Sequence, residues 1–68
     1  MVELRINGEL KTVPPDLSSI TELLEWLGIK SDRVAVELNK QLVRKRDWHQ
    51  TAVPGGSQVE IVEFVGGG

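Results

Sequence analysis

The chain has 68 residues, enough for one domain with a single small core. Hydrophobic residues make up 40% and charged residues 26%, a balance typical of a globular domain rather than a disordered chain. Without cysteine, the chain can form neither a disulfide framework nor a cysteine-based zinc site or nucleophile. A net charge of −2 gives no basic field for nucleic acid. No apolar run reaches the length of about 18 residues that spans a bilayer, and no signal peptide is recognisable, so we expect a cytoplasmic protein without a membrane partner.

Alternating apolar and polar residues over positions 2–6 predict a half-buried strand. Asn7-Gly8 follows and predicts a β-hairpin. We expect a three-residue loop with Gly8 as a left-handed bulge, because this register sets Leu4 opposite Leu10 and keeps apolar side chains on one face. A two-residue loop would place Leu10 on the face opposite Leu4.

One amphipathic helix is predicted after Pro14-Pro15, which ends the second strand because proline supplies no donor to a ladder. Ser19 and Glu22 have the spacing of a capping box, in which the Ser hydroxyl and the Glu side chain satisfy free amides of the first turn. Apolar residues then recur at helical spacing, at positions 20, 23, 24 and 27. Gly28 suits the left-handed conformation that ends many helices.

The second half of the chain predicts three more strands, over residues 34–38, 41–44 and 59–65. Asn39-Lys40 is expected to turn the first of these into the second, and residues 47–50 to form a turn or a single helical turn.

One helix on one face of a mixed sheet is the economical packing for this order of elements. We therefore predict an α+β fold of the ubiquitin-like, β-grasp kind, with four to five strands and one main helix. The expected boundaries are a single domain over residues 1–65 and a flexible glycine-rich tail over residues 66–68.

The alternation of the last strand has a consequence for binding. Val59 and Ile61 are expected to point one way, and Val62 and Phe64 the other. Val62 and Phe64 would form an apolar docking patch for a protein partner, unless neighbouring loops cover them. Basic residues also gather shortly before this strand. Arg44, Lys45 and Arg46 could form a basic rim beside the acidic residues Glu60 and Glu63 and so orient such a partner, although solvated loops account for the same pattern.

The sequence offers little for catalysis. His49 is the only histidine, so no histidine cluster can bind a metal ion, and polar neighbours favour a surface role. The carboxylates show no spacing typical of an acid–base pair. Gly55-Gly56-Ser57 is too short for a phosphate-binding loop. We expect no catalytic residue, no metal and no bound cofactor in this chain.

The chain closes on three glycines, Gly66 to Gly68. A frayed terminus or a cloning remnant would explain them. Glycine also lacks a Cβ, so Gly66 and Gly67 could thread a narrow channel of a partner and leave the carboxyl group of Gly68 unhindered. Joined to AMP as an acyl-adenylate, that carboxyl group would become reactive toward sulfur or an amine.

Over essentially its whole length the chain resembles the sulfur-carrier proteins of thiamine biosynthesis, the ThiS family. The resemblance rests on the early Asn-Gly turn, the helix S-I-T-E-L-L-E-W-L, the segment V-A-V-E-L-N, Q-L-V, Trp48 and the closing V-E-I-V-E-F-V-G-G-G. Two positions depart from the family pattern. Gly56-Ser57 replaces the usual Gly-Asp before the last strand, and Arg44-Lys45 stands where many members have Pro-Arg.

The resemblance implies a cycle of activation and delivery. An E1-like adenylating enzyme would use ATP and Mg²⁺ to activate Gly68, and a sulfur donor such as a cysteine desulfurase or a rhodanese-like protein would convert the adenylate to a thiocarboxylate. The thiocarboxylate would deliver sulfur to thiazole synthase. Three alternatives stay open: a carrier like the small subunit of molybdopterin synthase, a ubiquitin-like protein modifier, and a non-covalent interaction module. The carrier and modifier hypotheses require Gly68 to be the native end of the chain.

Overall fold

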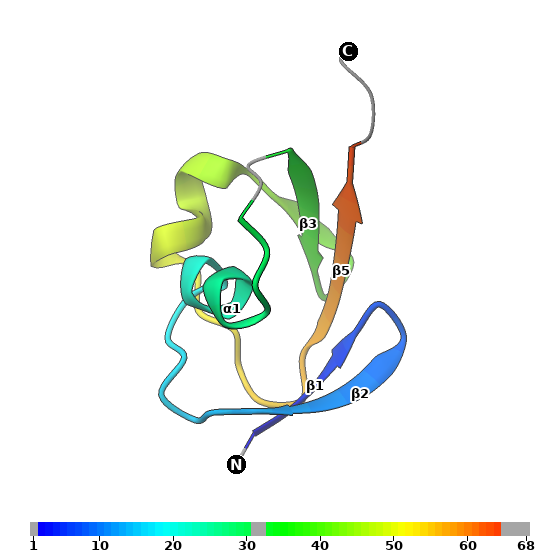
Figure 1. The fold of residues 1–68 in the computed structure, drawn as a ribbon, viewed down its shortest axis with the longest axis vertical. Coiled ribbons are helices and arrows are strands. Elements are labelled where there is room, and N and C mark those ends of the chain that lie inside the picture. The colour runs from blue at the N-terminus through cyan, green and yellow to red at the C-terminus, as the bar shows by residue number, and fades with distance from the viewer. Residues whose placement is uncertain (1, 31–32, 65–68) are drawn as a thin grey trace.

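The computed structural model describes residues 2–30 and 33–64, and its elements are arranged in two layers (Figure 1). One layer is a five-stranded mixed sheet in the order β2-β1-β5-β3-β4. The central strands β1 and β5 run parallel, and the other neighbours pair antiparallel. The strands are β1 (Val2–Ile6), β2 (Glu9–Val13), β3 (Val34–Leu38), β4 (Gln41–Val43) and β5 (Gln58–Glu63). Helix α1 (Ile20–Trp26) and the 3₁₀ helix η1 (Lys45–Gln50) lie over one face, which is the predicted ubiquitin-like β-grasp arrangement.

The predicted register of the first hairpin is wrong. The structure has a two-residue loop, with φ of 50° at Asn7 and 82° at Gly8, and it pairs Leu4 with Lys11 and Arg5 with Leu10. Two positive φ angles make the kind of turn whose twist matches that of the flanking strands. The register exposes Leu10 but buries Val13 on the core side of the edge strand. Turn geometry and the burial of Val13 therefore outweigh the exposure of Leu10.

Local signals at both ends of α1 act largely as predicted. The Ser19 hydroxyl accepts a hydrogen bond from the Glu22 amide at 3.2 Å. The Glu22 carboxylate binds the amide and hydroxyl of Ser18, both at 3.0 Å, one residue earlier than a capping box requires. At the other end Gly28 has φ of 79°, and the Ile29 amide donates to the Leu24 carbonyl at 2.9 Å. This pair of features is a Schellman motif, and it ends the helix.

The core fills the space between the two layers. It combines the inner side chains of the sheet with the apolar stripe of α1 and with Trp48: Leu4, Ile6, Val13, Ile20, Leu23, Leu24, Val34, Val36, Trp48, Val59 and Ile61. Trp48 belongs to η1, and its indole N–H donates to the Val43 carbonyl at 2.9 Å, so the ring is buried with its polar atom satisfied. This bond ties η1 to the end of β4.

The later elements agree with the predicted order and differ at their ends. The fourth strand stops at Val43, one residue before the predicted end, because Arg44 is already the N-cap of η1. The predicted turn or helical turn is a 3₁₀ helix that begins two residues earlier than expected, at Lys45. Strand β5 ends at Glu63, although the Phe64 amide still donates to the Arg33 carbonyl at 2.8 Å. The predicted boundary at residue 65 lies outside the described residues.

Candidate functional site

Strand β5, which leads to the glycine tail, lies between β1 and β3 inside the sheet. Its side chains alternate, so Val59 and Ile61 are buried in the core. Val62 lies opposite Ala35 of β3 on the other face, and Phe64 follows two positions along the same face. Both Val62 and Phe64 keep 58% of their surface exposed. The alternation predicted for this strand is therefore observed, and no described loop covers the two side chains.

A further apolar side chain on this outer face was missed by sequence reasoning. Leu42 of β4 lies opposite Glu37 of β3, on the same face as Ala35, and keeps 67% of its surface exposed. We call Ala35, Leu42, Val62 and Phe64 the outer apolar patch. The alternation of the short segment Gln41-Leu42-Val43 contained the signal, but three residues are too few to indicate which face of a sheet each side chain occupies.

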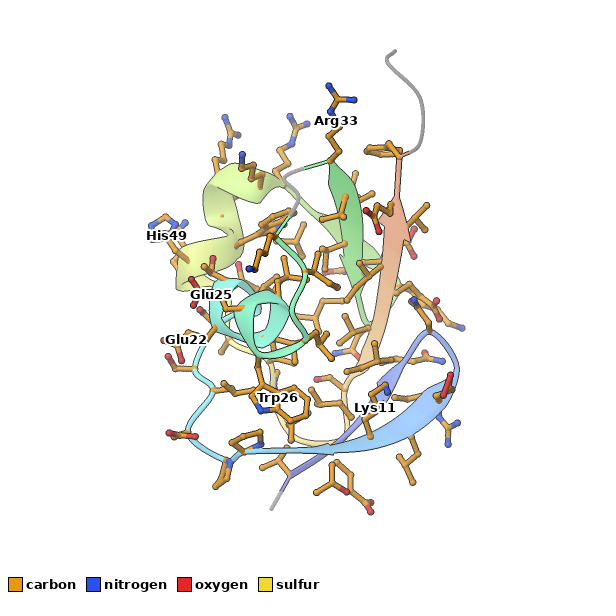
Figure 2. All side chains as sticks on the ribbon, in the orientation of Figure 1. Lys11, Glu22, Glu25, Trp26, Arg33 and His49 are labelled. Atoms are coloured by element: carbon orange, nitrogen blue, oxygen red, sulfur yellow. The ribbon has the colours of Figure 1, made fainter. Side chains whose placement is uncertain are left out.

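Basic residues occur at the end of the sheet where β5 finishes. Arg33 lies beside the start of β3 at this end (Figure 2), and its carbonyl accepts the bond from Phe64. Arg44 is exposed and, with Leu42, lines a shallow pocket along η1. Lys45 lines a different pocket with Trp48, between η1 and α1. The structure thus places Arg44 next to the outer apolar patch and Lys45 toward the helical layer, so the predicted basic rim divides between two surfaces.

Two asparagine side chains fix the position of β5. Asn7 sits in the first hairpin turn, and its side chain accepts from the Ile61 amide at 2.7 Å and donates to the Ile61 carbonyl at 3.1 Å. The Asn7 amide also donates to the Val59 carbonyl at 2.9 Å. Strand β1 itself pairs with β5 only through Arg5 and Ile6. The Asn7 side chain therefore extends the β1–β5 ladder beyond the last paired residue of β1.

Asn39 acts in the same way from the second hairpin turn. Its side-chain oxygen accepts from the Gln58 backbone N–H at 2.9 Å, and the backbone N–H of Asn39 donates to the Gln58 carbonyl at 2.7 Å. Its side-chain nitrogen lies 3.4 Å from the hydroxyl of Ser57, which is buried. The side chain of Ser57, one of the two departures from the family pattern, thus contacts the turn before β4, while its backbone N–H donates to the Pro54 carbonyl of its own turn at 3.1 Å. Together Asn7 and Asn39 hold β5 from both sides.

The remaining predicted positions have plain outcomes. Gly66, Gly67 and Gly68 lie outside the described residues, so their role stays a prediction. His49 is exposed on η1, on the far side of the molecule from β5 (Figure 2). Within residues 2–30 and 33–64, no group of three or more His, Asp or Glu side chains is placed to hold a metal ion. None of the helices described is long and apolar enough to cross a membrane.

Comparison with known proteins gives consistent matches. The model of the ThiS family matches residues 3–68. A sulfur carrier protein ThiS of Bacillus subtilis is 34% identical over 96% of this chain and 98% of its own length. The crystal structure of a thiamine biosynthesis protein (ThiS) from Geobacter metallireducens superposes with a TM-score of 0.83, at 37% identity over 97% of this chain and 99% of that one. A thiazole synthase of Paramagnetospirillum magneticum is 42% identical over 98% of this chain, which spans only 20% of that relative.

Proposed function

Because the chain belongs to the ThiS family, we propose that it is a sulfur carrier of thiamine biosynthesis. The observation that carries the proposal is the extent of the family match, which continues from residue 3 through the last glycine. The carrier of Bacillus subtilis supports it, since nearly the full lengths of the two chains align. The cytoplasmic location expected from the sequence is part of this proposal.

The proposed chemistry takes place at the carboxyl group of Gly68. A carboxylate is a poor electrophile, so an E1-like enzyme would join it to AMP at the expense of ATP, with Mg²⁺ bound by that enzyme. A persulfide on a cysteine desulfurase or a rhodanese-like protein would then displace AMP to form an acyl disulfide. A thiol would cleave its S–S bond, which leaves the thiocarboxylate and a new disulfide on the donor side. The carrier supplies no catalytic group in this scheme. Its contribution is a tail without side chains, which suits a narrow active site.

The described residues would contribute docking and anchoring. The Asn7 bonds to Ile61 and the bond from the Phe64 amide to the Arg33 carbonyl hold the later part of β5 in the sheet, so the point from which the chain runs on toward the glycines is held in place. The outer apolar patch lies on the same strand and its neighbours, close to this point. A partner that covers the patch would therefore receive the tail in a defined position.

Thiazole synthase is the proposed recipient of the sulfur. Two proteins with this name, from Paramagnetospirillum magneticum and Magnetococcus marinus, match 98% of this chain with 20% of their own length. A carrier-like segment and a thiazole synthase therefore occur in one polypeptide in these relatives. We infer that this chain delivers its sulfur to a thiazole synthase.

The proposal is tested by the intact mass of the purified chain after incubation with ATP, Mg²⁺, a sulfur source and extract of its native host. We expect a shift equal to the replacement of one oxygen by sulfur, absent from a variant without Gly68. An unchanged mass, in an extract that thiolates a known carrier, would contradict the proposal. Slow-migrating conjugates that contain the chain would instead indicate a protein modifier.

The docking role of the patch has a separate test. Phe64→Ala should weaken binding to the activating enzyme by about tenfold or more, as truncation of an aromatic anchor in an interface commonly does. Leu10→Ala is a matched control, because Leu10 also keeps 58% of its surface exposed but lies on β2, separated from β5 by β1. Equal affinities of the wild type and Phe64→Ala would rule out this patch as the docking surface.

A further inference from the structure

Two carboxylates face each other across the outer surface of the sheet. Glu37 of β3 is paired with Glu60 of β5, and both side chains are exposed. The ladder alternates between hydrogen-bonded and open pairs. Backbone bonds join Asn39 to Gln58 at one end and Phe64 to Arg33 at the other, so the Glu37–Glu60 pair is also a hydrogen-bonded one. Its Cα atoms are therefore about 5.5 Å apart.

This arrangement carries a cost in the free protein. Like charges directly opposite each other in a sheet are destabilising. Among the described residues, no cation forms an ion pair with either carboxylate. Arg5 lies on the same face one strand away, but its register partner is Gln58 and its guanidinium donates to the Gly8 carbonyl at 3.2 Å. Within residues 2–30 and 33–64, the two negative charges therefore have no ion-pair partner.

The charged pair belongs to an ordered pattern along β5. Glu60, Glu37 and Leu42 form one row across the outer face. The next row toward the tail holds Val62 and Ala35, and beyond it Phe64 is bonded to Arg33. Negative charge, apolar surface and basic residues thus follow one another in the direction in which the chain runs toward its tail. A partner that is complementary to this surface can bind it in only one orientation.

We propose that the Glu37–Glu60 pair is a docking determinant that receives an Arg or Lys side chain of the activating enzyme, flanked there by apolar residues that cover the outer apolar patch. This inference rests on the proposed function and adds to it the chemistry of the partner surface. One cation between two carboxylates compensates both charges and removes their repulsion. Because the pair lies at the opposite end of the patch from the tail, the contact fixes the direction in which the tail enters the enzyme.

The test compares the double variant Glu37→Gln/Glu60→Gln with a control that removes two negative charges elsewhere, Glu9→Gln/Glu25→Gln. Glu9 lies in β2 and Glu25 on α1, both exposed and away from the outer face. Affinity is measured by calorimetry with the purified E1-like enzyme of the same host, at low and high salt. Stability of each chain alone is measured by urea denaturation.

In the Gln double variant, the stability of the free chain should rise while its affinity for the activating enzyme falls. Removing the repulsion lowers the unfolding equilibrium constant by up to about fivefold. The same change weakens binding to the activating enzyme by about tenfold and flattens its salt dependence, because a charge contact across the interface is lost. The control should change the affinity much less. Conversion to Glu37→Lys/Glu60→Lys should weaken binding further.

Three results would overturn the inference. The first is unchanged affinity in the Gln double variant, and the second is an equal loss in the control. The third is a loss of affinity for thiazole synthase alone, which would assign the pair to another partner. Failure of the proposed function is recognised separately, since at saturating activating enzyme the Gln double variant should still acquire the thiocarboxylate mass. A wild-type chain that never acquires it would contradict the carrier function itself.

Discussion

Replacing Asn7 by glycine should destabilise the domain through the strand that leads to the tail. The side chain of Asn7 makes hydrogen bonds of 2.7 and 3.1 Å to the two backbone groups of Ile61. Glycine keeps the turn, because it adopts the observed φ of 50° without strain, but it removes both bonds. The variant thus isolates the contribution of the side chain from that of the turn.

The magnitude follows from the two lost bonds. Each contributes about 0.5–1.5 kcal/mol, so the expected loss is roughly 1–3 kcal/mol in the free energy of unfolding. The total free energy of unfolding of a chain of this length is roughly 3–10 kcal/mol. Asn7→Ala should lose about 1 kcal/mol more than Asn7→Gly, because an alanine in the left-handed region is strained.

Urea denaturation followed by tryptophan fluorescence gives the change, and hydrogen exchange of the Ile61 amide localises it. Lys40→Gly is the control, because Lys40 also has a positive φ, of 72°, and its side chain makes no hydrogen bond with any described residue. Lys40→Gly should leave the free energy of unfolding unchanged or raise it slightly. A loss below about 0.5 kcal/mol for Asn7→Gly would show that the reasoning from the two bonds is wrong.

Three smaller predictions concern local structure. Gly28→Ala should cost about 1 kcal/mol in urea denaturation, from the left-handed φ alone, because an added Cβ would meet no atom within 4 Å; a cost near zero would contradict this reasoning. Ser19→Ala should lower stability by about 1 kcal/mol and helical circular dichroism slightly, since the bond to the Glu22 amide is lost. Trp48→Phe should cost about 1–3 kcal/mol in the free energy of unfolding, because the part-buried Val43 carbonyl loses its donor; Trp26→Phe, at an exposed position, should leave the unfolding midpoint unchanged.

The sequence was sufficient where the deciding interactions are local. The helix is bounded by Ser19 and Gly28, and each acts on groups within a few residues of itself. The period of two predicted the buried and exposed sides of β5. The order of elements then predicted the fold class, since one helix can cover one face of one sheet.

Only the tertiary structure decided the remaining features, because they depend on which strands become neighbours. The hairpin register was a balance between exposing Leu10 and burying Val13, and the burial of Val13 depends on packing beneath the sheet. Asn7 bonds to a residue 54 positions away, so nothing near it in the sequence indicates its role. Glu37 and Glu60 likewise become opposed only because β3 lies beside β5. Cross-strand neighbours follow from strand order and register, which are set by the packing of the whole domain.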